Sequence, residues 1–449
     1  MRKLAAPVAL FMILWVAVAP AAAQGQPVSI IRDAEIEAII RTYATPLFQA
    51  AGLSPQAITV YLVDDDSLNA FVTPGLRMFI HTGLILQTED PGALIGVIAH
   101  ETGHLAGGHT ATRGDALERA QMGVLASTIL GLGAAILTGR GEAAHAVMSS
   151  GKDVALKGLL SYTRGQESAA DQAAVRFLNA TGQSLGGLVE FMHALEDQEV
   201  LLSSNQDPYL RTHPLTGERI RFLQHQDEIS PNYGKPSDPQ LVALHNRMRA
   251  KLAGFLETPE QVARLYPKSD TSSDARYARA IVEYREAHLE NALPLIAGLI
   301  AEEPGNPYFH ELKGQMLFEN GRLAEALEPY QKAVALAEGS PQLELGLARV
   351  LIELDRPGDN EAALPHLDAV LRDETGNALA WRLKAVAHGR IGETGLAALA
   401  LAEMSLARGD HRGAISQAAR ALDQLPESSP GWLRAQDLKQ LAEREDKEN

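Results

Sequence analysis

Two histidines and a glutamate in residues 97–104 have the types and spacing of a metal-dependent hydrolytic site. The segment reads Val-Ile-Ala-His-Glu-Thr-Gly-His, an HExxH motif. If it is helical, His100 and His104 lie four residues apart on one helix face, where two neutral imidazoles can share one zinc ion. Glu101 then lies beside the metal, where its carboxylate can take a proton from the attacking water and pass it to the leaving amine. The motif therefore predicts hydrolysis of peptide bonds.

The residues around the motif predict that it lies in a buried helix. Asp90 and Pro91 have the types of an N-cap and a first-turn residue, and residues 93–98 provide an apolar helix face. Gly107 and Gly108 follow one turn after the second histidine and can end the helix. The two histidines are therefore expected in the last turns of a helix that packs in a core.

A catalytic zinc needs a third protein ligand and an open position for water. The best candidate is Glu167 in residues 161–171, a helical stretch in which Glu167 and Asp171 share one face at positions i and i+4. Glu167 would bind the metal, while Asp171 could accept a hydrogen bond from a ligand imidazole and select its tautomer. The alternative is a helix surface that carries two solvated acids.

His109 is a rival third ligand, because some zinc peptidases use the longer motif HExxHxxGxxH. Gly107 fits that motif, but the position of its third histidine is occupied by Thr110, and His109 comes one residue early. His109 is therefore expected to be a structural histidine or a partner of a ligand. The remaining alternative is a secreted protease of the metzincin type that uses His109.

The first 23 residues are predicted to be a secretory signal peptide. Arg2 and Lys3 precede an apolar run over residues 4–18, and Ala21-Ala22-Ala23 offers a cleavage site. The chain has no cysteine, so the expected exported protein has neither a lipid anchor nor a disulfide. The periplasm is the expected compartment. The alternative, a retained membrane anchor, conflicts with a run shorter than the roughly 20 residues that a span requires.

The composition describes a folded, acidic protein. Of its 449 residues, 46% are hydrophobic and 21% charged, which excludes global disorder. The formal net charge is −16, and removing the two cations of the predicted signal peptide gives −18 for the mature chain. Because no basic stripe is evident, no nucleic-acid partner is expected.

A 34-residue period in the second half predicts a helical repeat array. Small residues recur at Ala280, Gly314 and Ala348, and proline recurs at Pro307 and Pro341. This period is typical of tetratricopeptide repeats, in which paired helices stack into a curved array. We expect about four repeats, with a helix near residues 432–441 as the cap. The concave surface of such an array is expected to dock protein segments; the alternative is a scaffold that only packs against the first half.

The predicted fold is mainly α with a small β-sheet, an α+β zincin-like peptidase domain over residues 24–265, followed by an α-helical repeat solenoid over residues 275–449. A linker over 266–274 separates the two. Residues 58–62 and 78–80 are short β-prone runs, and Pro74-Gly75 marks a turn before the second. The second strand could lie along the cleft and pair with an extended substrate; the alternative is a plain core strand.

The segment Met122–Leu137 is almost uncharged and rich in glycine and alanine. It is too short for a simple membrane span, and its glycines favour packing. We expect a buried or cleft-covering element, with peripheral membrane contact as the alternative.

Four motifs together resemble the zinc metallopeptidase family that includes the CAAX prenyl proteases. They are Asn69-Ala70-Phe71, the HExxH segment, the Arg-x-x-Glu-x-x-Ala-Asp segment that starts at Arg164, and Thr212-His213-Pro214 with Arg219-Ile220. The predicted signal peptide and repeats are similar to those of the periplasmic branch of this family. The likeness runs over essentially the whole mature chain.

The resemblance implies one zinc ion per chain, held by His100, His104 and Glu167. It implies Glu101 as the general base and Asp171 as a supporting residue. His213 matches a further family histidine near the metal, where it stabilises the oxyanion or occupies the fourth position of a self-inhibited form, with Arg219 nearby.

Two functions of different classes follow. The resemblance implies a periplasmic zinc endopeptidase in quality control and assembly of outer-membrane β-barrel proteins, whose repeats recruit unfolded or stalled precursors or their assembly machinery. It degrades stalled precursors and could assist the assembly of others. The alternative is a chaperone or adaptor in which the repeats bind proteins and the zinc site is structural or vestigial.

Overall fold

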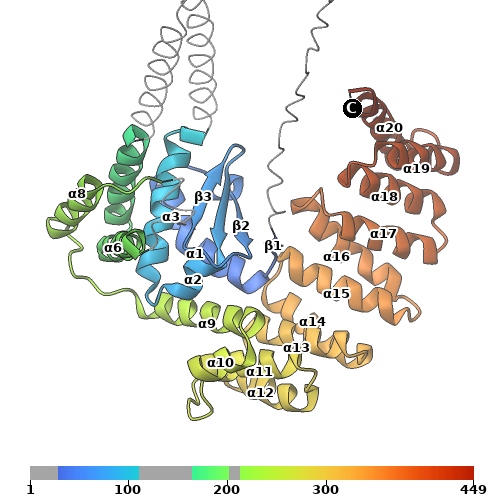
Figure 1. Cartoon of the computed structure of the whole chain (residues 1–449). Helices are drawn as coiled ribbons and strands as arrows, with labels where there is room; N and C mark the ends of the chain where they lie inside the picture. Colours follow the sequence, from blue (N-terminus) through green and yellow to red (C-terminus); the bar gives the residue numbers. More distant parts are fainter. Residues whose placement is uncertain (1–28, 111–163, 202–212, 449) are drawn as a thin grey trace, which may run out of the picture.

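The computed structural model describes residues 29–110, 164–201 and 213–448, which form a half built around a small sheet and a helical array (Figure 1). The expected signal peptide and the segment Met122–Leu137 lie outside these residues. None of the described helices combines the length and hydrophobicity needed to cross a membrane. The mainly helical fold with a small sheet, followed by a repeat solenoid, is as predicted.

The sheet has four strands in the order β1-β2-β4-β3. They are β1 (Ile30–Ile31), β2 (Thr59–Val63), β3 (Ala70–Thr73) and β4 (Arg77–His81). β2 and β4 are parallel, while β1 and β3 run antiparallel to their neighbours. One face is buried, and the other carries stacked aromatic rings, with Phe79 against both Tyr61 and Phe71. β1 and β3 are therefore the edge strands of the described sheet.

The two predicted strands correspond to β2 and β4, each within one residue. The expectation that the second of them lies along the cleft and pairs with substrate is wrong. β4 has a paired strand on each side, and both Met78 and Ile80 are buried in the core. The sequence reading missed β3, which ends at the Pro74-Gly75 turn and reaches the sheet edge because that turn folds it back onto β4.

Helix α3 (Pro91–Ala106) lies in the centre of this half. Asp90 caps it by accepting a hydrogen bond from the Gly92 amide at 2.7 Å, and Gly107 is its C-cap, as predicted. It packs in one hydrophobic core with the sheet, α1 (Ala34–Ala50), α6 (Gly186–Leu201) and the helix at residues 164–180. The short α2 (Thr82–Gln87) follows β4, and α8 (Gly217–Glu228) packs on α6.

Glycines on α3 let the neighbouring helices come close to its backbone. A Cβ at Gly96 would lie 2.7 Å from the Cβ of Leu188 on α6. A Cβ at Gly103 would lie 2.9 Å from the carbonyl oxygen of Ala170, in the helix at residues 164–180. Gly103 therefore allows that second helix to approach the HExxH segment.

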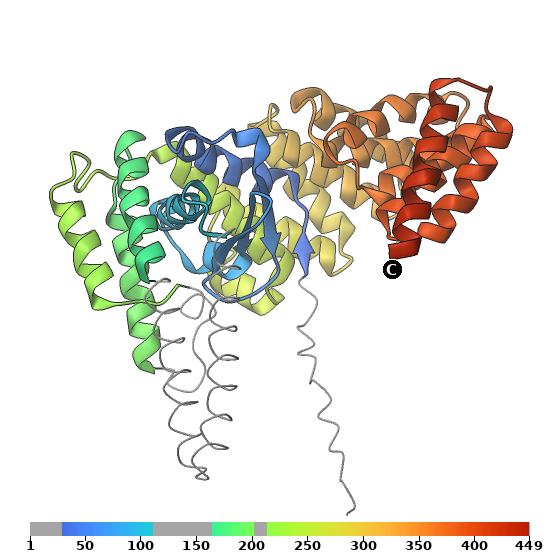
Figure 2. The ribbon, with the colours of Figure 1, turned by 90° about the horizontal axis from the view of Figure 1, so that it is seen from above.

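The second half is a stack of helix pairs that begins beside α9 (Pro239–Leu256) and α10 (Pro259–Leu265). Its helices are α11 (Ser273–Arg285), α12 (Leu289–Glu302), α13 (Pro307–Glu319), α14 (Leu323–Leu336), α15 (Pro341–Leu354), α16 (Asp359–Asp373), α17 (Ala378–Arg390), α18 (Thr394–Ala407), α19 (His411–Gln424) and α20 (Pro430–Glu448). Its last helix, α20, lies far from the sheet in both views (Figures 1 and 2).

The 34-residue period marks the positions where these helices touch, as predicted. Ala280 and Ala348 are fully buried, and a Cβ at Gly314 would lie 2.7 Å from the ring of Tyr330. The repeated prolines begin α13 and α15. Proline suits the first turn of a helix because its missing amide hydrogen has no helical partner there.

The two halves are joined by a buried charge cluster at the start of α1. Lys251 of α9 is 1% exposed, and its Nζ lies 2.8 Å from Oδ2 of Asp33, the N-cap of α1. Tyr277 of α11 donates a hydrogen bond of 2.8 Å to Glu35 of α1. α9 contacts both the first core and α11, so helices pack continuously across this region. The division into domains at residues 265 and 275 stays a prediction.

We expect Gly103→Ala to lower the free energy of unfolding by about 1–3 kcal/mol, because the added Cβ overpacks a contact with backbone. Gly165→Ala is the matched control: Gly165 is also helical, and a Cβ there meets nothing within 4 Å. The control should be neutral or stabilising by up to about 1 kcal/mol. Urea unfolding of the three proteins measures the difference, and equal midpoints for the two variants would contradict it.

Candidate metal centre

Three of the predicted site residues project from the last turns of α3. His100 and Glu101 are fully buried, and His104 is 6% exposed. The ring nitrogens His100 Nε2 and His104 Nε2 lie 3.1 Å apart. The helical spacing of the motif therefore brings both imidazoles to one point, as predicted.

The helix at residues 164–180 brings the predicted acids to the same point. Glu167 Oε2 lies 3.3 Å from His100 Nε2, and Glu167 Oε1 lies 3.4 Å from His104 Nε2. Asp171 Oδ1 lies 2.9 Å from His100 Nδ1, the other nitrogen of that ring. Both acids are buried, so the alternative of a solvated helix surface is excluded.

His213 and Arg219 complete the cluster from the chain around the start of α8. His213 Nδ1 lies 3.2 Å from both carboxylate oxygens of Glu167, and its Nε2 lies 3.4 Å from Glu101 Oε1. Arg219, in the first turn of α8, donates hydrogen bonds of 2.7 and 2.9 Å to the two oxygens of Asp171. It also lies 3.0 Å from Glu167 Oε2.

The donor atoms fit a zinc ion. The described part of the chain holds one group of side chains able to bind a metal, namely His100, His104, Glu167 and His213, whose donor atoms lie within 4.8 Å of one another. Tetrahedral zinc with bonds of about 2.0–2.2 Å places neighbouring donors about 3.3–3.6 Å apart. The separations of 3.1, 3.3 and 3.4 Å among the two α3 histidines and Glu167 are close to these values.

The charges of the cluster are mutually stabilised. Burial opposes the charged form of Glu167, but hydrogen bonds with the three histidines outweigh it and hold the pKa of this carboxyl well below its usual range. Burial likewise lowers the pKa of His100, but hydrogen bonds to Asp171 and Glu167 raise it to about 9. Burial dominates at His104 and lowers its pKa to about 3. Burial also opposes the charged form of Asp171, but hydrogen bonds with Arg219 and His100 outweigh it and lower the pKa of this carboxyl.

Glu101 has the environment of a proton acceptor. Neither of its carboxylate oxygens has a hydrogen-bond partner among the described residues. Burial raises its pKa above the ordinary value. A carboxylate of raised pKa is a stronger base, and oxygens that accept no hydrogen bond can still accept one from a water molecule.

His109 lies outside the group of donors. Its Nδ1 is 2.9 Å from His104 Nδ1, the nitrogen on the opposite side of the ring from the cluster. A Cβ at Gly107 would lie 2.5 Å from the His109 ring, so this glycine makes room for the contact. His109 is therefore placed as a neighbour of His104 rather than as the third donor to the same ion.

A cleft of about 160 Å³ opens onto the cluster. Its walls include Glu101, His104 and His213, together with residues 71–73 of the edge strand β3. The sequence reading did not assign β3 to the site. The signal that could have found it is the β-prone Ala-Phe-Val-Thr run directly before the Pro74-Gly75 turn, which predicts a hairpin with β4.

Comparison with known proteins agrees with this geometry. Residues 31–227 match the model of peptidase family M48, and residues 277–341 and 317–387 match tetratricopeptide-repeat models. The chain is similar to the beta-barrel assembly-enhancing protease of Yersinia pestis, at 27% identity over 73% of this chain and 68% of that protein. The protein of the same name from Escherichia coli K12 is 23% identical over 73% of this chain and 67% of that protein.

A third relative matches a shorter part of the chain. The mitochondrial metalloendopeptidase OMA1 of Schizosaccharomyces pombe is 28% identical over 181 residues, which are 40% of this chain and 49% of that protein. The HExxH helix, the buried donor cluster and these matches lead to one conclusion. The chain is a metalloendopeptidase with a peptidase family M48 domain, followed by tetratricopeptide repeats.

Proposed function

We propose that this protein is a periplasmic zinc endopeptidase that acts on outer-membrane β-barrel precursors. The observation that carries the proposal is the buried cluster of imidazole and carboxylate donors. Beside it, Glu101 lines a cleft and accepts no hydrogen bond from the described residues. Nitrogen and carboxylate donors in near-tetrahedral spacing favour zinc.

In this proposal His100, His104 and Glu167 would hold the zinc ion. When bound, it would supply Lewis acidity for a water molecule and a substrate carbonyl. Glu101 accepts the proton of the attacking water and delivers it to the leaving amine. Asp171 accepts the Nδ1–H of His100, so that the Nε2 proton is the one a metal would displace, and Arg219 holds Asp171 in place.

His213 has two roles open to it in this geometry. Its ring lies between Glu167 and Glu101, close enough to face the oxygen of a reacting carbonyl. From the same position it could act as a fourth metal donor, which would leave no open position for water. The first role assists catalysis, and the second describes a self-inhibited form.

The edge strand β3 supports a protein substrate of varied sequence. The described sheet leaves one edge of β3 without a partner strand, and its residues form one wall of the cleft. An extended peptide can pair with such an edge through main-chain hydrogen bonds, which carry little side-chain selectivity. Unfolded β-barrel precursors are extended chains of this kind.

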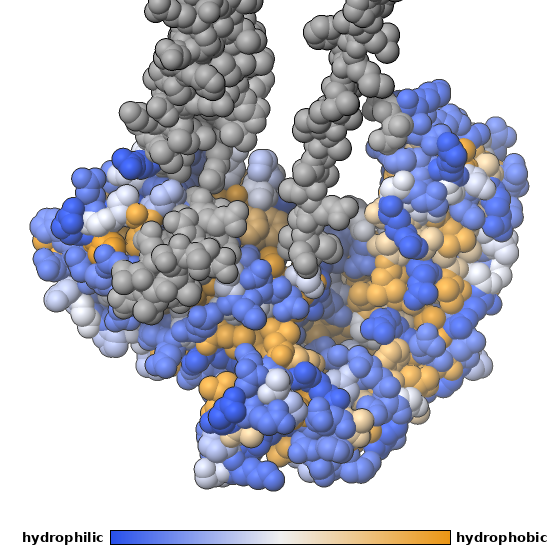
Figure 3. All heavy atoms as spheres, in the orientation of Figure 1, coloured by the Kyte–Doolittle hydropathy of each residue, from blue (hydrophilic) through white to orange (hydrophobic). Residues whose placement is uncertain are grey.

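The compartment and the partners rest on the relatives and on sequence. The names of the bacterial relatives point to the assembly of outer-membrane β-barrels, and residues 1–23 have the composition of a signal peptide. The repeats offer a surface for precursors or their assembly machinery. Hydrophobic residues gather over the middle helices of the array (Figure 3). Leu379 and Val386 of α17 are each more than a third exposed.

A second candidate is a chaperone or adaptor with a structural zinc. It is favoured by the fact that His213 stands among the donors, because four protein ligands are typical of structural zinc sites. The two candidates make opposite predictions for Glu101.

We expect Glu101→Gln to lower the rate of proteolysis of casein or of an unfolded β-barrel precursor by about 10²- to 10⁴-fold, because the general base is lost. Zinc content should not change. Glu218→Gln, an exposed residue of α8, is the control and should keep full activity. The adaptor candidate instead expects Glu101→Gln to complement a deletion strain completely, and such a result would contradict the proposed protease.

We expect about one zinc per chain in the wild-type protein by elemental analysis, and its loss in Glu167→Ala, which removes a donor of the cluster. His109→Ala should retain zinc, because His109 faces the other nitrogen of His104. The reverse pattern, with zinc lost only in His109→Ala, would overturn the assigned ligands.

A further inference from the structure

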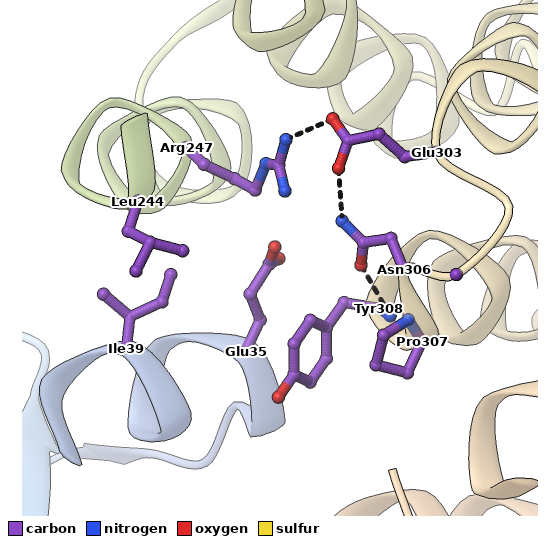
Figure 4. A pocket seen from close by; sticks show the side chains of 9 residues that line it. Glu35, Ile39, Leu244, Arg247, Glu303, Asn306, Pro307 and Tyr308 are labelled. Carbon is purple, nitrogen blue, oxygen red and sulfur yellow. Dashed lines mark hydrogen bonds and ion pairs between the residues drawn. The ribbon is translucent and has the colours of Figure 1, made fainter. Parts of the chain in front are cut away.

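A second pocket, here called the junction pocket, lies where the sheet-bearing half meets the array. It has a volume of about 290 Å³ and is lined by residues of α1, α9 and the turn between α12 and α13 (Figure 4). Pockets that hold small ligands begin at about 300 Å³. It shares no lining residue with the catalytic cleft. It is therefore a separate place, formed by both halves together.

Glu35 presents a buried carboxylate oxygen to this pocket. The residue is 1% exposed, and its Oε2 accepts a hydrogen bond from Tyr277 and lies 3.3 Å from Lys251 Nζ. Its Oε1 has no hydrogen-bond partner among the described residues. The carboxylate points into the pocket (Figure 4). Leaving a buried acceptor without a donor is costly, so this oxygen is suited to receive one from a ligand.

Arg247 offers a donor on the opposite wall. Its Nη2 donates to Glu303 Oε1 at 2.5 Å, and its guanidinium lies 5.0 Å from the centre of the Phe309 ring. Its Nε has no hydrogen-bond partner in the described part of the chain. The pocket thus combines one unpartnered acceptor with one unpartnered donor.

The charges and the apolar wall indicate what fits. The lining carries two carboxylates, Glu35 and Glu303, against the one guanidinium of Arg247. Behind the pocket, the single ammonium of Lys251 is shared between Glu35 and Asp33, so three carboxylates face two cations in this region. A cation therefore improves the charge balance. Ile39 and Leu244 form an apolar wall beside Glu35 (Figure 4), which suits the aliphatic stem of a long basic side chain.

We propose that the junction pocket binds the side chain of a lysine or arginine in a protein segment. The ammonium or guanidinium donates to Glu35 Oε1, the stem lies on Ile39 and Leu244, and a carbonyl of the same segment accepts from Arg247 Nε. A basic residue is thereby recognised by the peptidase half and the array at once. That the segment belongs to a client rests on the proposed function, whereas the binding itself needs no proteolysis.

The test compares two probes that differ in the charged group. Nα-acetyl-lysine amide and Nα-acetyl-norleucine amide are titrated into the full mature chain at low salt, and binding is followed by saturation-transfer NMR. Glu35→Gln removes the charge, and Leu244→Trp fills the pocket while leaving Glu35 intact. Glu286→Gln, an exposed acid outside the pocket, is the matched control. Melting curves establish that each variant is folded.

We expect the lysine probe to bind at least tenfold more tightly than the norleucine probe. Glu35→Gln should abolish this preference, Leu244→Trp should abolish binding, and Glu286→Gln should change neither. Equal binding of the two probes, no binding of the lysine probe, or a preference that survives Leu244→Trp would overturn the proposal. If Glu35→Gln does not fold, Leu244→Trp decides alone. Because Glu101→Gln leaves these titrations unchanged, failure here is distinguishable from failure of the proposed protease.

Discussion

The sheet-bearing half depends on keeping two carboxylates, Glu167 and Asp171, ionised inside a hydrophobic core. An unpaired buried charge costs several kcal/mol, so each acid needs close partners. Arg219 lies against both acids, and the histidines supply the remaining contacts. The acids lie in the helix at residues 164–180, and their partners come from α3 and the start of α8. The ion pairs therefore hold three separate segments together. The metal donors face one point as a consequence of the same pairing.

This pairing is possible because the helices approach α3 closely. Gly103 lies in the helical turn between His100 and His104 and faces the backbone of Ala170. A larger residue there would push the helix that carries the two acids away from the imidazoles. Close packing in a core permits little adjustment, since added volume forces neighbours apart. Gly103 is not one of the metal donors, yet the donor cluster depends on its lack of a side chain.

The same reasoning applies at the junction of the two halves. α1 packs against α3 and also carries Glu35 and the capping Asp33, which are bound by groups of α9 and α11. One helix therefore connects the array with the helix that bears the catalytic motif. The array and the cleft are therefore held in a defined relation to one another.

The sequence alone predicted the features of the fold and of the site that depend on residues close together in the chain. Features that involve neighbours along the chain follow from helical geometry alone, which sets the distances between them. They are the caps at Asp90 and Gly107, the four-residue spacing of the histidines, the shared face of Glu167 and Asp171, and the 34-residue repeats. Tertiary structure decided what pairs over long separations: Arg219 with Asp171 across 48 residues, and Tyr277 with Glu35 across 242. It also decided that β4 is central, that β3 borders the cleft and that His109 contacts the Nδ1 side of His104 rather than joining the donor group. Periodicity carries no record of these contacts, because they depend on which surfaces meet after the elements have formed.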